Sequence, residues 1–132
     1  MIQVGEERRE EDSDATVFHR PALALLYRLG GNKLVGEIID VFSVSAPMQI
    51  AAARAGAESG DSDAIRRALH ALKSSAGQLG ALRMQQRCEE GEALSSKGPS
   101  AELSQLVLGL DAEYSVARQR LSEVRRNGLN GF

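Results

Sequence analysis

His70 is the residue of this chain whose neighbours are best suited to chemistry. The apolar residues around it recur every three or four positions, which predicts one buried stripe on a helix. They are Ile65, Leu69, Leu72, Ala76 and Leu79. The polar and smallest residues fall on the other side of the same helix: Asp63, Arg66, Arg67, His70, Lys73, Ser74 and Gly77. This spacing predicts an exposed imidazole on a surface that can hold a phosphoryl group while another protein lies against it.

Two polar residues that follow His70 are candidates for assisting it. Lys73 lies three positions later, so its ammonium group can reach the same face and balance the charge of a phosphate. The alternative is an ordinary solvated lysine. Gln78 lies eight positions after His70, near the predicted end of the helix. Its side chain is a candidate hydrogen-bond partner for the imidazole or for the phosphate.

The remaining residues of this face are candidates for docking a partner. Ser74 and Gly77 are too small to obstruct a close approach, so they are predicted to provide clearance rather than chemistry. Arg66 and Arg67 are candidates for orienting an acidic partner surface, although a solvated charged face is the simpler explanation.

The run from Leu69 to Ala81 closely resembles the signature of histidine-containing phosphotransfer (HPt) domains, roughly His-x-Leu-Lys-Gly-Ser/Ala-Ala/Ser-x-x-Leu-Gly-Ala. Seven residues match it in register: His70, Leu72, Lys73, Ser75, Leu79, Gly80 and Ala81. The family usually has glycine four residues after the histidine, where this chain has Ser74. The resemblance implies an all-α antiparallel four-helix bundle with a short additional N-terminal helix. It also implies that His70 is the phosphoacceptor, which makes it a nucleophile in covalent catalysis.

The same resemblance implies a function. An HPt domain would accept a phosphoryl group from the aspartate of one receiver domain and pass it to another. The implied partners are response-regulator receiver domains and a hybrid histidine kinase. Mg²⁺ would be bound by the receiver, so no cofactor is expected on this chain. Two functions of other classes stay open: a non-phosphorylated helical interaction module, and an accessory that promotes dephosphorylation of receivers.

Composition restricts the class of protein. The 132 residues carry a net charge of −2, and the first 14 alone carry −4, so neither part is basic enough to predict a nucleic-acid partner. The start of the chain lacks a signal-peptide pattern and no window approaches 18 apolar residues, so no membrane span is expected. A single cysteine excludes an internal disulfide and fits a reducing cytosol. We therefore expect a cytoplasmic protein.

The sequence patterns of nucleotide and metal sites are missing. Neither a GxxxxGKS/T nor a GxGxxG loop occurs, so we expect neither ATP binding nor autokinase activity. His19 has no His, Cys or carboxylate partner at metal-ligand spacing, so no metal site is expected. Cys88 lies on the apolar side of its predicted helix, so it is expected to be buried rather than reactive.

The predicted domain covers residues 14–127, after a disordered acidic leader at 1–13 and before a short tail at 128–132. A short helix that follows Pro21 is expected to end at Gly30-Gly31. Four longer helices are predicted at about residues 32–57, 62–79, 81–95 and 101–127, and their short links favour an antiparallel bundle. Docking is expected to use the His70 face and exposed apolar residues of the first two helices.

Three local features qualify these helices. Pro47 lies inside the first long helix and predicts a kink near residues 43–46. Ser59-Gly60-Asp61 is expected to separate that helix from the next and to cap the latter. Gly91 thins the apolar face of the 81–95 helix, which is therefore predicted to be the loosest. No sustained heptad repeat extends beyond the domain, so a monomer is expected.

Overall fold

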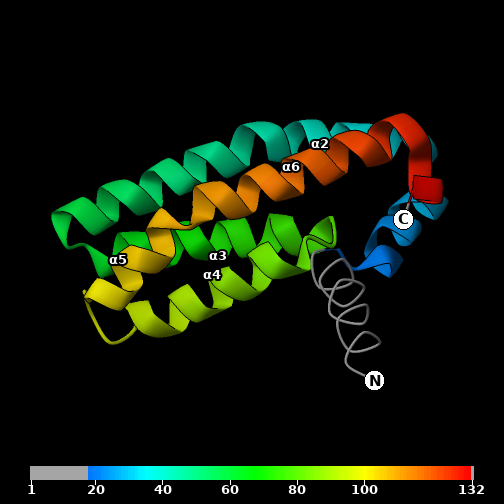
Figure 1. The fold of residues 1–132 in the computed structure, drawn as a ribbon. Coiled ribbons are helices and arrows are strands. Elements are labelled where there is room, and N and C mark those ends of the chain that lie inside the picture. The colour runs from blue at the N-terminus through cyan, green and yellow to red at the C-terminus, as the bar shows by residue number, and fades with distance from the viewer. Residues whose placement is uncertain (1–17, 132) are drawn as a thin grey trace, which may run out of the picture.

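The protein folds into a bundle of helices, shown in Figure 1. This computed structural model describes residues 18–131, so the predicted leader at 1–13 lies outside the described residues. The elements in chain order are α2 (Arg20–Ser59), α3 (Ser62–Gln78), α4 (Leu82–Ser95), α5 (Ala101–Leu108), α6 (Leu110–Asn127) and a 3₁₀ helix, η1 (Gly128–Gly131). Residues 18–131 contain no strand, and the predicted all-α bundle is confirmed.

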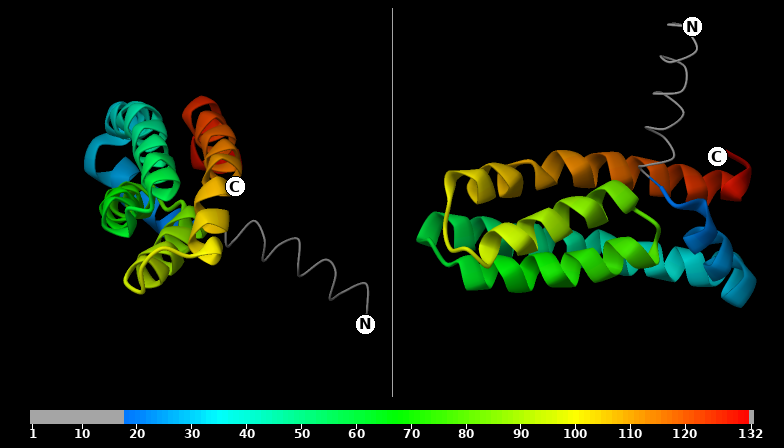
Figure 2. Two further views of the ribbon diagram at one scale, coloured as in Figure 1. Left: turned by 90° about the vertical axis from the view of Figure 1, so that its left-hand side faces the viewer. Right: turned by 90° about the horizontal axis from the view of Figure 1, so that it is seen from below.

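The first helix consists of two segments joined at Gly31. Gly31 has φ 65° and ψ −158°, and it is the only residue inside α2 with non-helical backbone angles. The predicted break at Gly30-Gly31 is therefore confirmed, and the segment before it is the short additional helix. This segment turns away from the rest of α2 and crosses the end of the bundle, as Figures 1 and 2 show.

A backbone contact fixes the first segment against the turn between α3 and α4. The His19 N–H donates a 2.6 Å hydrogen bond to the Gly80 carbonyl oxygen. Gly80 has φ 75°, and a Cβ atom there would lie only 2.5 Å from the His19 oxygen. Only glycine fits both the backbone angle and the space at residue 80. Gly80 therefore allows the turn after α3 to pack against the start of the described chain.

Pro47 does not break α2. The prediction of a kink near residues 43–46 is not borne out in the backbone angles, which stay helical throughout that region. Pro47 has no N–H to donate to the Ser43 carbonyl one turn earlier. The Tyr114 hydroxyl of α6 donates to that carbonyl instead, at 3.4 Å, and the Tyr114 ring packs against Phe42 with centroids 5.8 Å apart. Packing against α6 therefore replaces the missing backbone donor.

The fourth helix of the bundle, predicted as one continuous helix at residues 101–127, is divided into two helices, α5 and α6. α5 ends at Leu108, Gly109 forms a turn, and α6 begins at Leu110. Glycine is a poor helix former, which explains why the interruption falls there. The two helices follow one another in Figure 1 and together form the fourth rod beside α2, α3 and α4.

Gly91 allows the side chains of neighbouring helices to pack closely against α4. A Cβ atom at Gly91 would lie 2.3 Å from Leu69 Cδ1 and 3.0 Å from Leu106 Cδ2. Side chains from α3 and α5 thus fill the space that a larger residue would occupy. The core face of α4 itself is small, as predicted, with only Met84, Cys88, Gly91 and Ser95 buried, but no gap results because side chains of neighbouring helices fill the space.

Cys88 is buried in the same core, as predicted. Removal from water, reinforced by the negative charge of Glu92, raises the pKa of its thiol to about 12. The thiol is therefore uncharged at neutral pH and behaves as a small apolar side chain.

α2 has a second apolar surface besides the one in the core. By length and composition alone it could cross a membrane, since an 18-residue window has a mean hydropathy of 1.3. The expectation that no such window exists was too strict. Ten residues of α2 are buried in the bundle, whereas Val41, Val44 and Met48 are exposed.

Candidate functional site

The site lies on α3, whose start and orientation follow from local chemistry. Gly60 ends α2 in the left-handed conformation, and the Asp61 side chain accepts a 3.0 Å hydrogen bond from the Ala64 N–H as the helix cap. The predicted apolar stripe is buried against the bundle: Ile65, Leu69, Leu72, Ala76 and Leu79. The opposite side of α3 faces outward, and 65% of the His70 side chain is exposed there.

A carboxylate from α4 joins His70 and Lys73. Glu92 Oε2 lies 3.4 Å from His70 Nδ1, and Glu92 Oε1 lies 3.1 Å from the Lys73 ammonium nitrogen. Sequence reasoning missed Glu92 because it follows His70 by 22 residues and belongs to another helix. The Glu92 carboxylate of α4 thus contacts both the His70 imidazole and the Lys73 ammonium group of α3.

The Glu92 carboxylate is held in a mostly buried position. Its side chain is only 21% exposed, and Oε1 accepts no hydrogen bond of good geometry although Lys73 lies within ion-pair distance. A carboxylate in such a place is stabilised by a nearby cation. Lys73 supplies that cation before any phosphate arrives.

The contact with Glu92 favours one tautomer of a neutral His70 imidazole. A carboxylate only accepts hydrogen bonds, so the contact requires the hydrogen of a neutral imidazole to be on Nδ1. The distance of 3.4 Å is at the long end of the hydrogen-bond range. Nε2 then carries the free lone pair, which is the form a nucleophilic imidazole needs.

The two arginines one turn before His70 are occupied by a residue of their own helix. Arg66 and Arg67 form ion pairs of 2.8 and 2.9 Å with the two oxygens of Asp63. The hydrogen bond from Arg66, followed by the charges of both arginines, lowers the pKa of the Asp63 carboxyl below its usual value. All three side chains are exposed, so this cluster lies at the edge of the His70 surface.

The small residues after His70 have different surroundings. Ser74 is exposed, and its hydroxyl donates a 3.2 Å hydrogen bond to the His70 carbonyl oxygen. Gly77 instead faces α4, where a Cβ atom would lie 3.1 Å from the Gln85 side-chain nitrogen. The small size of Gly77 therefore allows α3 and α4 to approach, whereas Ser74 borders the open surface.

Gln78 lies apart from His70. Within residues 18–131 no hydrogen bond joins them, and eight residues of helix separate them by about 12 Å. Gln78 lines a hollow of about 250 Å³ between α2 and α3, together with Glu37, Ile38, Val41, Phe42, Ser75 and Leu79.

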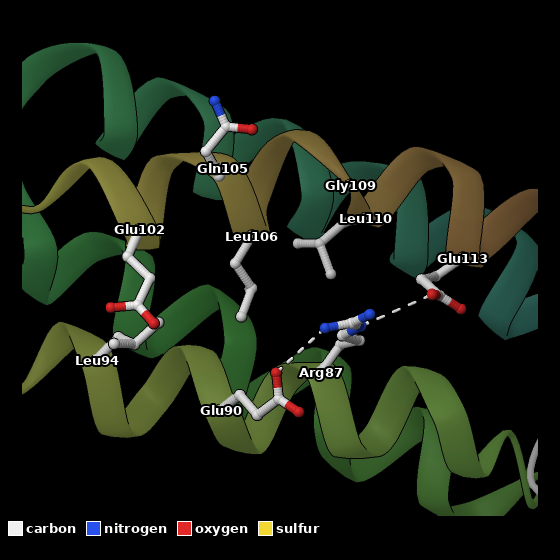
Figure 3. Close-up of a pocket in the computed structure, with 9 residues that line it drawn as sticks. All are labelled: Arg87, Glu90, Leu94, Glu102, Gln105, Leu106, Gly109, Leu110 and Glu113. Atoms are coloured by element: carbon white, nitrogen blue, oxygen red, sulfur yellow. Dashed lines mark hydrogen bonds and ion pairs between the residues drawn. The ribbon is translucent and has the colours of Figure 1, made fainter.

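A second hollow, of about 340 Å³, lies between α4 and the α5–α6 rod and is drawn in Figure 3. Arg87 extends across it, with 3.3 Å to a Glu90 oxygen and 3.8 Å to a Glu113 oxygen. Neither His70, Lys73 nor Glu92 lines it. The Arg87–Glu113 ion pair links α4 to α6, whereas the Arg87–Glu90 pair lies within α4, and both lie outside the His70 site.

Comparison with known proteins identifies the family. The Hpt domain model matches residues 37–126, which is more than half of the chain, and the protein therefore belongs to the Hpt domain family. Its role is phosphotransfer in two-component signalling, in which Hpt domains interact with response-regulator receiver domains.

The fold has a counterpart among solved structures. The histidine-containing phosphotransfer protein B (HptB) from Pseudomonas aeruginosa PAO1 superposes with a TM-score of 0.79 and 20% sequence identity, covering 85% of this chain and 96% of that chain. At this identity the likeness concerns the fold. No curated protein sequence matches the chain.

Proposed function

We propose that this protein is a phosphorelay intermediate, in which His70 accepts a phosphoryl group from the aspartate of one receiver domain and passes it to another. The observation that carries the proposal is the exposed His70 imidazole, whose Nδ1 contacts Glu92 while Lys73 lies on the same carboxylate. The seven-residue match from His70 to Ala81 and the family of the chain support it.

The proposed transfer is an in-line displacement at phosphorus, with the exposed His70 imidazole as the nucleophile. The Nε2 lone pair attacks the phosphorus of the aspartyl phosphate, the P–O bond to the aspartate breaks, and the carboxylate leaves with the electron pair. Glu92 accepts the hydrogen bond from Nδ1–H throughout, so Nε2 is the nucleophilic nitrogen in every cycle of transfer. Passing the group to a second aspartate reverses these steps.

The charges around the reacting atom come from both proteins. We propose that the Mg²⁺ required for transfer is bound by the receiver, and that this chain contributes Lys73. Among residues 18–131 no group of three or more His, Cys, Asp or Glu side chains is arranged to hold a metal ion. We further propose that the protein acts as a cytoplasmic monomer, with receivers and a hybrid histidine kinase as partners.

Lys73→Ala is expected to slow transfer by roughly 10- to 100-fold, because a hydrogen bond to a charged group contributes about 1.5–3 kcal/mol. The side chain is 26% exposed and close enough to turn from Glu92 to a phosphate on His70. The measurement is the single-turnover rate of transfer from a phosphorylated receiver. Lys73→Arg, which keeps the charge, should lose much less, and equal rates for all three proteins would remove Lys73 from the reaction.

Ser74→Leu is expected to reduce transfer strongly without affecting the fold. Ser74 lies one turn beyond His70 on the open surface, where a receiver loop must pass to bring its aspartate to Nε2. Ser74→Gly is the matched control and should transfer at least as fast as the wild type, at a helix cost of roughly 0.5 kcal/mol. Normal transfer by the leucine variant would show that receivers approach from another side.

The proposed function is tested by incubating the protein with a phosphorylated receiver. Appearance of phosphohistidine on this chain, followed by its loss when a second receiver is added, is the expected result. Release of inorganic phosphate without phosphohistidine would instead indicate an accessory that promotes dephosphorylation of receivers. Binding without any movement of phosphate would indicate an interaction module.

A further inference from the structure

The hollow drawn in Figure 3 is large enough for a small molecule and lies apart from His70. Its volume of about 340 Å³ is within the range of about 300–1,000 Å³ that is typical of ligand pockets. Gly109, at the turn between α5 and α6, lines the hollow without a side chain. A Cβ atom at Gly109 would meet the carbonyl oxygens of Leu106 and Gln105, at 3.5 and 3.8 Å, and no side chain of another described helix within 4 Å. The turn that divides the fourth helix therefore leaves this space open.

Part of the wall of the hollow is apolar and comes from three helices. Leu94 of α4, Leu106 of α5 and Leu110 of α6 line it. Leu110 is buried, and Leu94 and Leu106 are half-buried against the core. Since the removal of apolar surface from water is favourable, these leucines favour a ligand with an aliphatic part.

The charged residues of the hollow are mostly acidic. Three carboxylates, from Glu90, Glu102 and Glu113, and one guanidinium, from Arg87, line it, which gives the lining a formal net charge of −2. Clefts that combine one sign of charge with apolar walls concentrate ligands of the opposite charge. The hollow is therefore suited to a cation rather than to an anion.

Arg87 shows how a cation is held in this hollow. Its guanidinium extends across the hollow in Figure 3, 3.3 Å from a Glu90 oxygen and 3.8 Å from a Glu113 oxygen. Arg83 also pairs with Glu113, at 3.5 Å. The carboxylates on the α6 side of the hollow are thus already balanced by cations of the protein itself.

Glu102, on the α5 side of the hollow, has no such cation. It is exposed, and within residues 18–131 it forms no ion pair. In Figure 3 its side chain extends toward Leu94 of α4, and Arg87 lies beyond Leu106. In the described part of the chain, this side of the hollow therefore combines an unpaired carboxylate with an apolar wall.

We infer that the hollow between α4 and the α5–α6 rod binds a small aliphatic amine or guanidine, with the cationic group at Glu102 and the aliphatic part on the leucines. Such a molecule has the same chemistry as the Arg87 side chain, an aliphatic stem that ends in a cation. An inorganic anion lacks both features, and a neutral alcohol lacks the charge. This ligand site is additional to the proposed phosphotransfer and does not depend on it.

The test is a titration of the isotope-labelled full chain with agmatine, which has an amine at one end of an aliphatic chain and a guanidine at the other. Saturable shifts are expected for the amide NMR signals of residues that line the hollow, with a dissociation constant of about 1 mM for a ligand of this size. At the same ionic strength, butanol and sodium butyrate should bind about tenfold more weakly or less, because neither is a cation. Equal affinities for agmatine and butanol would overturn the inference.

Two substitutions test the charge and the space separately. Glu102→Gln should weaken agmatine binding about tenfold, because the amide carries no charge. Gly109→Leu should also weaken it, because leucine takes up part of the hollow, and the φ of −80° at this residue accommodates any side chain. Glu89→Gln is the matched control and should bind like the wild type, since Glu89 is exposed on α4 next to Glu90 but does not line the hollow.

Two results of this series would contradict the site. One is an agmatine affinity that neither Glu102→Gln nor Gly109→Leu weakens relative to Glu89→Gln. The other is a set of shifts that spread over the whole surface and never saturate. Since the titration involves no phosphoryl transfer, either result would leave the proposed function of His70 untouched.

Discussion

His70→Gln is expected to abolish phosphoryl acceptance while the bundle stays folded. The glutamine amide has no nucleophilic nitrogen, but its NH₂ group can still donate a hydrogen bond to Glu92. Because the side chain is 65% exposed, the free energy of unfolding should change by no more than about 0.5 kcal/mol. The measurements are labelling by a phosphorylated receiver, with the acid lability and base stability of the product as the sign of a P–N bond, and urea unfolding.

His19→Gln is the matched control for this experiment. The chain contains two histidines, and His19 holds Gly80 through its backbone rather than its side chain. His19→Gln should therefore be labelled as well as the wild type. Labelling of the His70 variant at a normal level would place the acceptor elsewhere and contradict the proposed chemistry.

Gly91→Leu is expected to destabilise the bundle by about 2–3 kcal/mol. Overpacking a filled core costs about 1–3 kcal/mol, and this site should be near the upper limit because Cβ alone would lie 2.3 Å from Leu69 Cδ1. The better helix propensity of leucine offsets only about 1 kcal/mol of a larger steric cost. The measurement is the free energy of unfolding in urea, supported by the thermal midpoint.

The pair Leu69→Ala with Gly91→Leu is the informative control. Leu69→Ala alone should cost about 2–5 kcal/mol by opening a cavity. In the double variant the new leucine can enter that cavity, so the combined loss should be smaller than the sum of the two single losses. Additive losses, or a stabilising Gly91→Leu, would contradict the packing described for this position.

Features that depend on neighbouring residues could be predicted from the sequence. The buried stripe from Ile65 to Leu79 follows from spacing, and the Asp61 cap and the break at Gly31 follow from residue chemistry alone. Together these elements place His70 on the exposed side of α3, as the spacing predicted.

Features that depend on contacts between helices could not be predicted. Glu92 reaches His70 from another helix, 22 residues away, and nothing in the spacing on α4 marks it. Tyr114 supplies the donor that Pro47 lacks, and Leu69 fills the space at Gly91, so two residues that looked like local weaknesses are compensated by distant side chains. The sequence-based prediction failed at these positions because it considered each helix separately from the helices that pack against it.

The contact between His19 and Gly80 fixes the end of the bundle at which the described chain begins. The described residues also finish at that end, where the Tyr27 hydroxyl donates a 3.3 Å hydrogen bond to the Val124 carbonyl oxygen and η1 follows α6 (Figure 1). A polypeptide that continues from either end of the described residues, 18 or 131, would therefore leave the bundle at this one end, whereas His70 lies on the exposed side of α3. In such an arrangement the linker length would set the effective concentration of His70 at a tethered receiver, so that shortening or lengthening a linker would tune signalling without altering the site.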